Sequence, residues 1–385
     1  MATANALPND TIRVEVGDYG LNEVTTPGVP GYSNFTDSSG TEHFDRDGVV
    51  LSTSYVSVIG YNTSINDLHN GGGVPIDNAK FKEIVDQGVF NGILKQPTIW
   101  GTSRDTGTGF RVNNAAQETL VMNLTFLDFS YGFSSEGNAR YTWIENILTC
   151  RTGKDDWPQA QPTCWGGGII FHSSKTGTIK NCRVRNCAGI GVNITTMSDG
   201  TVVKDTDVYC DDNETGDQGA TDYYFQIADS NNVEVNNCNA LRLNGPFGYP
   251  AHTGHGFLFS GWVDEPAGVT YTTTGNEFIG CGTSDVAESF LFIGKRVDAN
   301  SVIGCYSERT SALTNETFQA SVQFTNGAKN NVVSRSRFDN SRSAIIYNVW
   351  EGRGLNPDEA AIDNLVENCI FNQCENALYR SAIGR

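Results

Sequence analysis

The chain of 385 residues carries 44 acidic against 26 basic side chains, which gives a formal net charge of −18 and an isoelectric point of about 4.6. This balance excludes nucleic acid and anionic membrane surfaces as expected partners, because binding phosphate groups requires a basic face. The 42 glycines favour strands and turns over helices, and no apolar run approaches the roughly 18–20 residues that span a bilayer.

The first ten residues, MATANALPND, lack the positive and apolar regions of a signal peptide. Two expectations for localisation follow. The protein is either secreted, with its signal already removed, or carried on a virion that lysis releases.

Residues 1–66 are expected to form an N-terminal cap and the first coils of a solenoid. Thr11–Val16 alternates as a strand does, Gly17–Gly20 is expected to turn the chain, and Val49–Leu51 and Val56–Gly60 give two further strands. Residues 67–119 are expected to hold early coils with a short helical excursion over Asn78–Gln87.

From residue 120 to 385 one pattern returns in phase, an apolar residue three places before a small or apolar one, in steps of 23 to 43 residues. Such a period predicts a solenoid in which a minimal coil carries variable insertions. The nine pairs are Val121/Leu124, Ile144/Ile147, Ile179/Cys182, Val203/Thr206, Val235/Cys238, Phe278/Cys281, Val302/Cys305, Val333/Ser336 and Val366/Cys369.

A second apolar strand follows each anchor strand, at 168–171, 189–192, 223–225, 256–259, 289–292, 321–324, 344–347 and 377–379. Parallel strands on adjacent coils lie about 4.8 Å apart, so equivalent side chains become vertical neighbours. We therefore predict an all-β, right-handed parallel β-helix that forms one domain.

Three insertions, Arg151–Trp165, Cys210–Thr221 and Leu243–His255, leave the chain just before a second strand. They are expected to emerge from one edge of the solenoid and to wall a binding groove. Exposed aromatic rings there would stack on sugars, with Trp157 and Trp262 as the best candidates, and His252 lies on the third insertion as a candidate substrate-binding residue.

The residue before each second strand forms a column of its own. Asp222, His255 and Glu288 occupy it on successive coils, which places an imidazole between two carboxylates. Such neighbours shift one another's pKa values and suit general acid-base work. An exposed polar ladder without chemistry is the alternative.

Two resemblances bear on these residues. The opening strand, Gly-x-Tyr turn and Ile-Gly step resemble the start of pectin-lyase-like parallel β-helices. Gly254-His255-Gly256 resembles the Gly-His-Gly strand of polygalacturonase-like glycoside hydrolases, which implies Asp222 as the acid, His255 as a proton relay, and Lys295 or Arg296 as the group that binds a sugar carboxylate. The chain departs from that family where Tyr223 replaces a second aspartate and where Asn186-Cys187-Ala188 carries no carboxylate.

A polysaccharide lyase is the competing enzyme class. β-Elimination needs a base near C5 of a uronic acid and a cation that neutralises its carboxylate. Tyr223, Lys295, Arg296 and Arg309 could supply those groups, although each basic residue could equally be a solvated charge on an acidic protein.

No cofactor is required by either chemistry, but calcium is possible. Asp211, Asp212 and Asp217 concentrate the hard oxygen ligands that Ca²⁺ prefers, without the spacing of an EF-hand. Half of the ten cysteines lie on the repeat column and are expected to be reduced, stacked core residues, with Cys150 and Cys164 as the candidate disulfide.

Two functions remain open on these grounds. The first is an extracellular or virion-borne protein, like a phage depolymerase, that binds a polysaccharide and cleaves it as a hydrolase or lyase. The alternative is a non-catalytic virion or surface protein, such as a tailspike, decoration or adhesion protein, for which a homotrimer or virion neighbours are the expected partners.

Overall fold

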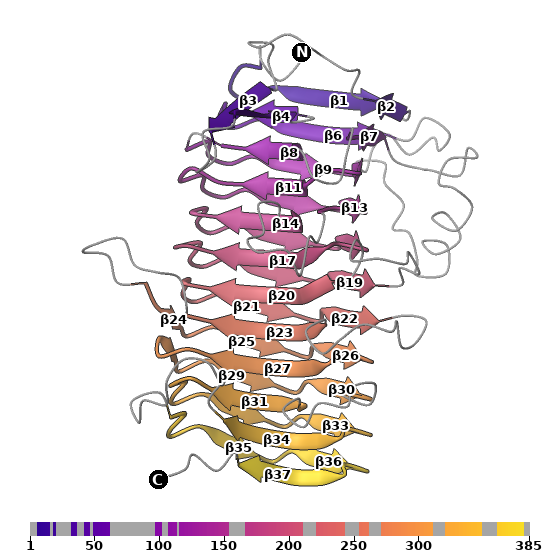
Figure 1. Ribbon diagram of the computed structural model, residues 1–385. Helices are drawn as coiled ribbons and strands as arrows, with labels where there is room; N and C mark the ends of the chain where they lie inside the picture. The colour runs from indigo at the N-terminus through magenta and orange to yellow at the C-terminus, as the bar shows by residue number, and fades with distance from the viewer. Residues whose placement is uncertain are drawn as a thin grey trace.

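Three parallel sheets wrap around one long core in the computed structural model, and each contributes one side of every coil (Figure 1). The structure describes residues 6–15, 18–20, 32–36, 42–46, 49–61, 97–101, 107–113, 115–153, 166–210, 221–242, 254–261, 271–310, 320–348 and 360–380. No helix occurs among them, and so none that is long and apolar enough to cross a membrane. The chain therefore forms a right-handed parallel β-helix, as predicted.

The first sheet carries the anchor strands. In spatial order it consists of β1 (Thr11–Glu15), β6 (Ser57–Tyr61), β9 (Leu120–Met122), β12 (Trp143–Glu145), β15 (Thr178–Lys180), β18 (Val202–Lys204), β21 (Glu234–Asn236), β25 (Glu277–Ile279), β29 (Ser301–Ile303), β32 (Val332–Ser334) and β35 (Leu365–Glu367). Val121 pairs with Ile144, and the column continues in register through Val235 to Val366. All nine predicted rungs are confirmed.

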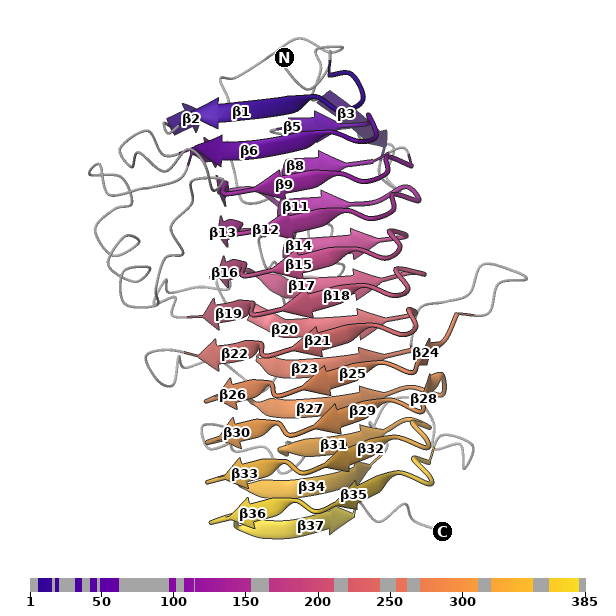
Figure 2. The same cartoon turned by 180° about the vertical axis from the view of Figure 1, so that it is seen from behind.

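The second sheet was not foreseen. It consists of β2 (Asp18–Gly20), β7 (Thr98–Trp100), β10 (Thr125–Leu127), β13 (Leu148–Cys150), β16 (Arg183–Arg185), β19 (Asp207–Cys210), β22 (Asn239–Arg242), β26 (Gly282–Ser284), β30 (Tyr306–Glu308), β33 (Arg337–Asp339) and β36 (Ile370–Asn372). Seen from behind, the labelled strands of this sheet are stacked along the left-hand side of the molecule (Figure 2).

The third sheet holds the predicted second strands. It consists of β5 (Val49–Leu51), β8 (Thr108–Val112), β11 (Tyr131–Ser135), β14 (Gly166–His172), β17 (Gly189–Thr195), β20 (Thr221–Ala228), β23 (His255–Ser260), β27 (Glu288–Ile293), β31 (Val322–Thr325), β34 (Ser343–Asn348) and β37 (Asn376–Arg380). Inside it Phe257 stacks between Phe225 and Phe290, with ring centroids 4.8 and 5.4 Å away. One continuous hydrophobic core runs from Leu51 to Phe338.

Asparagine stabilises the corners of the coils. At the corner between the first and second sheets, Asn123, Asn146 and Asn181 adopt φ values of 58°, 55° and 50°, a left-handed conformation that asparagine tolerates well. The Asn146 side chain donates to Asn123 Oδ1 at 2.9 Å, and that of Asn181 donates to Asn146. The repeated turn residue thus also bonds neighbouring coils together.

The stacked cysteines are confirmed as core thiols. Cys182, Cys238, Cys281 and Cys305 are buried and unbonded, and Cys369 is half-buried. The Cys305 sulfur accepts a hydrogen bond from the Cys281 backbone at 3.3 Å. Cys164, and with it the candidate disulfide to Cys150, lies outside the described residues.

The N-terminal prediction is partly correct. β1 pairs in parallel with β6, as two coils of a solenoid should. Residues 18–20 were expected to turn the chain, but they form strand β2 and pair with β7. β3 (Tyr32–Thr36) and β4 (Glu42–Arg46) form an antiparallel pair that was not predicted, and the small pair β24 (Thr273–Thr274) and β28 (Val297–Asp298) extends a corner. The helical segment expected over 78–87 lies outside the described residues.

Candidate functional site

The polar column lies at the start of three neighbouring strands of the third sheet, β20, β23 and β27. Tyr223 pairs with His255, and His255 pairs with Glu288. The prediction put Asp222 in this column, and that register was wrong by one residue. Between β17 and β20 the pairing shifts, so that Gly189 faces Thr221 while Ile190 faces Tyr223. Asp222 is the extra residue of a β-bulge at this point in β20.

Asp222 nevertheless stays beside the column. Its backbone carbonyl accepts a hydrogen bond from the Gly254 N–H at 3.2 Å. Its negative charge contributes to the electrostatics of both Tyr223 and His255. The three predicted catalytic residues are therefore brought together, with Tyr223 inserted into the position expected for Asp222.

The column faces away from the core. A Cβ on Gly256 would lie 2.7 Å from the Thr283 methyl group, so position 256 faces inward and His255, before it, faces outward. Tyr223 packs against a small apolar cluster, separate from the main core, that contains Leu258, Leu291 and Ile293. The outer face of the third sheet here is thus apolar next to the three polar groups.

His255 and Glu288 form a buried, hydrogen-bonded pair. His255 Nδ1 lies 2.7 Å from Glu288 Oε2, and the two residues are 5% and 2% exposed. Burial alone would lower the pKa of His255, but the charge and hydrogen bond of Glu288, together with the charge of Asp222, outweigh it and raise that pKa. Glu288 therefore orients the ring and makes its other nitrogen, Nε2, more basic.

Tyr223 covers the opposite side of the same imidazole. The two rings are stacked, with centroids 5.0 Å apart and planes inclined by 21°. Burial, the charge of Asp222 and that of Glu288 raise the pKa of Tyr223 well above its usual range. The phenol thus keeps its proton and can act as a donor next to a histidine that can accept one.

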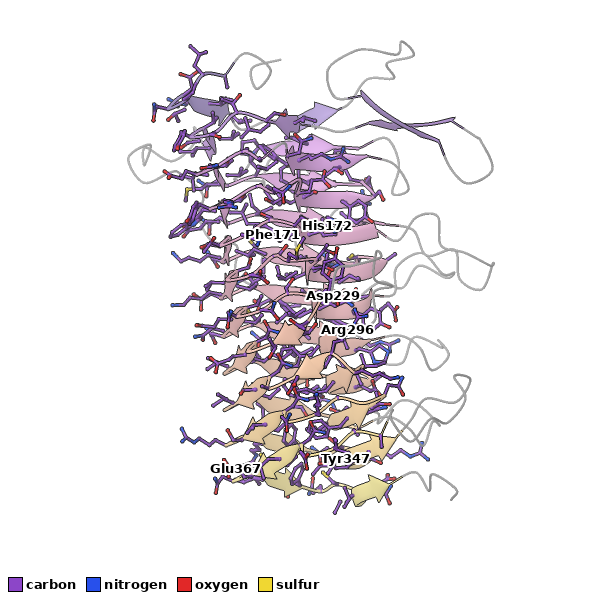
Figure 3. The ribbon with its side chains drawn as sticks, turned by 90° about the vertical axis from the view of Figure 1, so that its left-hand side faces the viewer. Phe171, His172, Asp229, Arg296, Tyr347 and Glu367 are labelled. Atoms are coloured by element: carbon purple, nitrogen blue, oxygen red, sulfur yellow. The ribbon has the colours of Figure 1, made fainter. Side chains whose placement is uncertain are left out.

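Lys295 and Arg296 lie away from this column. They follow β27, in the corner that leads to β28, whereas Glu288 is the first residue of β27. Figure 3 labels Arg296 among the side chains. Seven residues of extended chain correspond to about 20 Å. The two cations therefore belong to the opposite end of the sheet, because a strand carries its two ends to different corners of the coil.

The remaining predicted site residues lie outside the described part of the chain: Trp157, Trp262, His252, Asp211, Asp212 and Asp217. No group of three or more metal-ligating side chains comes together among the described residues. The calcium prediction thus stays a prediction.

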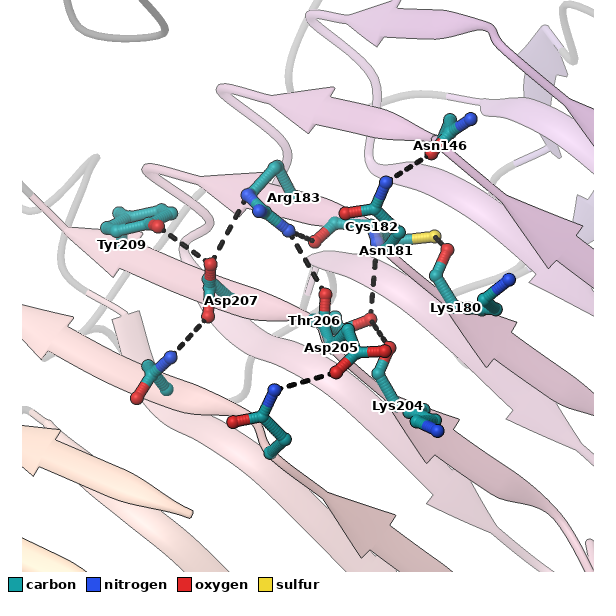
Figure 4. A network of polar contacts seen from close by, with 12 residues as sticks. Asn146, Lys180, Asn181, Cys182, Arg183, Lys204, Asp205, Thr206, Asp207 and Tyr209 are labelled. Carbon is teal, nitrogen blue, oxygen red and sulfur yellow. Dashed lines mark hydrogen bonds and ion pairs between the residues drawn. The ribbon is translucent and has the colours of Figure 1, made fainter. Parts of the chain in front are cut away.

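A second polar network was missed by the sequence analysis. On the outer face of the second sheet, Asp207 accepts hydrogen bonds from Tyr209 at 2.9 Å and Asn239 at 2.7 Å, and Arg183 Nε lies 3.3 Å from it (Figure 4). Arg183 also donates to the carbonyl of Asp205. These partners tie β16, β19 and β22 together and use the carboxylate of Asp207 structurally.

No protein-family model and no curated protein sequence matches this chain. Among solved structures, the fold is similar to the catalytic domain of a GH87 alpha-1,3-glucanase in complex with nigerose, with a TM-score of 0.56, 12% identity, and 97% of this chain and 64% of that chain covered. It is also similar to a mutant tailspike protein of E. coli bacteriophage HK620 in complex with a hexasaccharide, with a TM-score of 0.52, 12% identity, and 96% and 59% covered.

These likenesses establish the fold alone, which is the parallel β-helix expected from the sequence. The chain spans less than two thirds of the length of either structure.

Proposed function

We propose that this protein is a polysaccharide-binding β-helix, secreted or virion-borne, that cleaves its ligand by proton transfer at Tyr223, His255 and Glu288. The observation that carries the proposal is the 2.7 Å contact between His255 Nδ1 and Glu288, with Tyr223 stacked on the same ring. The similar solved structures, a glucanase and a tailspike protein bound to saccharides, support the ligand class by analogy.

Of the two enzyme classes, the arrangement fits β-elimination from a uronate better, because it provides both a base and an acid. The cation that neutralises the uronate carboxylate is not among these three residues, and Lys295 and Arg296 lie beyond the other end of β27. In that reaction His255 Nε2 takes the proton from C5, the C4–O bond breaks, and a C4=C5 double bond forms. Tyr223 gives its proton to the departing glycosidic oxygen, so no water is consumed. Glu288 stabilises the imidazolium that results, since its carboxylate stays on Nδ1 throughout.

Inverting hydrolysis fits less well. It requires a second carboxylate about 6.5–9.5 Å from the acid, free to activate a water molecule. Glu288 is 2% exposed and engaged with His255. Of the two predicted catalytic carboxylates that leaves Asp222, and one carboxylate cannot serve as both acid and base in the same step.

The burial of the pair favours a second candidate function. His255 is only 5% exposed, and a buried ion pair can serve as a device that fixes one arrangement of the coils. On this alternative the protein is a non-catalytic spike, decoration or adhesion protein, with copies of itself or virion neighbours as partners.

Product release from polygalacturonate, alginate, hyaluronate and dextran separates these functions. An unsaturated product that absorbs in the ultraviolet indicates elimination, and new reducing ends without that absorbance indicate hydrolysis. We expect the unsaturated product, and a loss of about 10²–10⁴-fold in His255→Ala. His172→Ala, which alters an exposed histidine at the end of β14, is the matched control. If the folded wild type releases no product from any acidic polymer, the structural role is favoured.

A further inference from the structure

A second surface, at the other end of the third-sheet strands, carries exposed aromatic rings. Tyr55, Tyr141 and Trp143 are 44%, 53% and 43% exposed. Arg140, which precedes Tyr141, is exposed as well. We call these four residues the aromatic strip. It lies at the corner between the third and first sheets, near β11 and β12, three strands away from β20 in the third sheet.

The strip runs along the axis of the solenoid. Tyr55, Glu118 and Tyr141 occupy equivalent turn positions on successive coils, with φ values of 62°, 52° and 56°. The Tyr55 N–H donates to the carbonyl of Gln117, and the Glu118 N–H donates to that of Arg140. Two coil steps therefore separate the tyrosines, which is about 10 Å along the axis, a spacing suited to a polymer of repeating units.

Trp143 is held in place although it is exposed. Its indole N–H donates to Glu145 Oε2 at 3.2 Å, and the other oxygen of Glu145 is 2.9 Å from Lys180 Nζ. The contact fixes the ring by its edge. A ring that is already ordered loses little entropy when a flat ligand stacks on it.

Arg140 adds an available positive charge. Within the described residues its side chain makes no hydrogen bond or ion pair, whereas Arg111, Arg151 and Arg183 each pair with a carboxylate. On a chain with a net charge of −18, such a guanidinium next to Tyr141 suits a carboxylate or sulfate of the ligand.

We propose that the aromatic strip is a second polysaccharide-binding site, which holds an acidic glycan chain along the solenoid axis and apart from Tyr223, His255 and Glu288. The choice of a glycan rests on the proposed function. A folded protein is a poorer fit, because a stable interface buries about 800 Å² on each partner, more than one line of four side chains offers.

Retardation of the full chain in native gels cast with polygalacturonate, alginate or hyaluronate tests this site, with dextran as the neutral polymer. We expect Trp143→Ala and Tyr141→Ala each to weaken the affinity about 3- to 10-fold, and Arg140→Gln to weaken it and to reduce its dependence on salt. Turnover of short oligosaccharides should stay unchanged in all three.

Tyr306→Ala and Arg335→Gln are matched controls, since both side chains are exposed and lie elsewhere on the solenoid. The inference is overturned if the three strip variants bind the acidic polymers as tightly as the wild type does. It is also overturned if no acidic polymer slows the migration of the wild-type protein. The proposed catalytic function fails on a different readout, namely turnover that persists in His255→Ala, so the two failures are distinguishable.

Discussion

The hydrophobic column of the first sheet and the polar column of the third sheet follow the same coil spacing with different regularity. From Val121 to Val366 the first column pairs without a shift. In the third sheet the register shifts by one residue between Gly189 and Ile190, where β17 pairs with β20, the strand that carries Tyr223. Regular stacking thus builds the rod, and an irregularity beside the large insertions sets which polar side chains meet.

The largest loss of stability is expected where the stack of phenylalanine rings inside the third sheet is interrupted. Phe257→Ala removes the fully buried ring between Phe225 and Phe290 and leaves a cavity, which should lower the free energy of unfolding by about 3–5 kcal/mol. Chemical denaturation followed by circular dichroism measures the loss.

Phe257→Leu is the control for this change, because it keeps most of the volume and should cost markedly less than the alanine. Equal losses in the two variants would mean that the stack of rings, and not the filling of the core, determines stability at this position.

A smaller loss is expected at the buried asparagine ladder. Asn300 is fully buried, and its side-chain N–H groups donate to Asn331 Oδ1 at 3.0 Å and to the Thr273 carbonyl at 2.9 Å. Asn300→Ala removes these two hydrogen bonds and the two that Asn300 Oδ1 accepts from Asn276, which should cost about 1–3 kcal/mol. Asn330→Ala, at the neighbouring exposed corner, should cost less, and a neutral result for Asn300→Ala would contradict a ladder that stabilises the coils.

The first and third sheets were predictable because each of their strands buries an apolar residue at a constant distance from a corner. Val235 and Cys238, for example, show this spacing directly in the sequence. The second sheet was not predictable from apolar residues, since strands such as Arg183–Arg185 have a charged residue on each side of the single apolar one.

The residues of the polar column were predicted, but the strand register that decides which of them pair was predicted only in part. His255 and Glu288 were correctly placed as neighbours, because β23 and β27 start without a shift. The bulge that displaced Asp222 has no signature in the sequence, where Thr221-Asp222-Tyr223 simply adds one residue to a long insertion. Lys295 and Arg296 were assigned by family resemblance, and position along the strand separates them from the column.

Glu288→Gln tests the contribution of the Glu288 charge within the polar column. The variant keeps a hydrogen-bonding group but removes the charge that raises the pKa of His255. If neutral His255 is the base, the acidic limb of the pH–rate profile should move to lower pH. A raised pKa in the folded state means that the pair stabilises the fold below the pKa of unfolded histidine, and that this stability is lost as pH rises through the folded pKa.

The stability of Glu288→Gln relative to wild type should therefore be lowest in mildly acidic solution and recover in alkaline solution. Denaturation midpoints at a series of pH values measure this difference. A difference that stays constant with pH would show that His255 and Glu288 do not titrate as a pair.

Asp222→Asn should give the smallest effect of these substitutions, a slight shift of the acidic limb of the pH–rate profile. Its charge is the last of the causes that raise the pKa of His255, after the charge and hydrogen bond of Glu288, and the bulge keeps it out of the pairing of Tyr223 with His255. The acidic limb should move in the same direction as in Glu288→Gln but by less, with little change in stability. A larger shift than that of Glu288→Gln would make Asp222 the dominant partner of the imidazole and restore the hydrolase assignment, in which Asp222 is the acid.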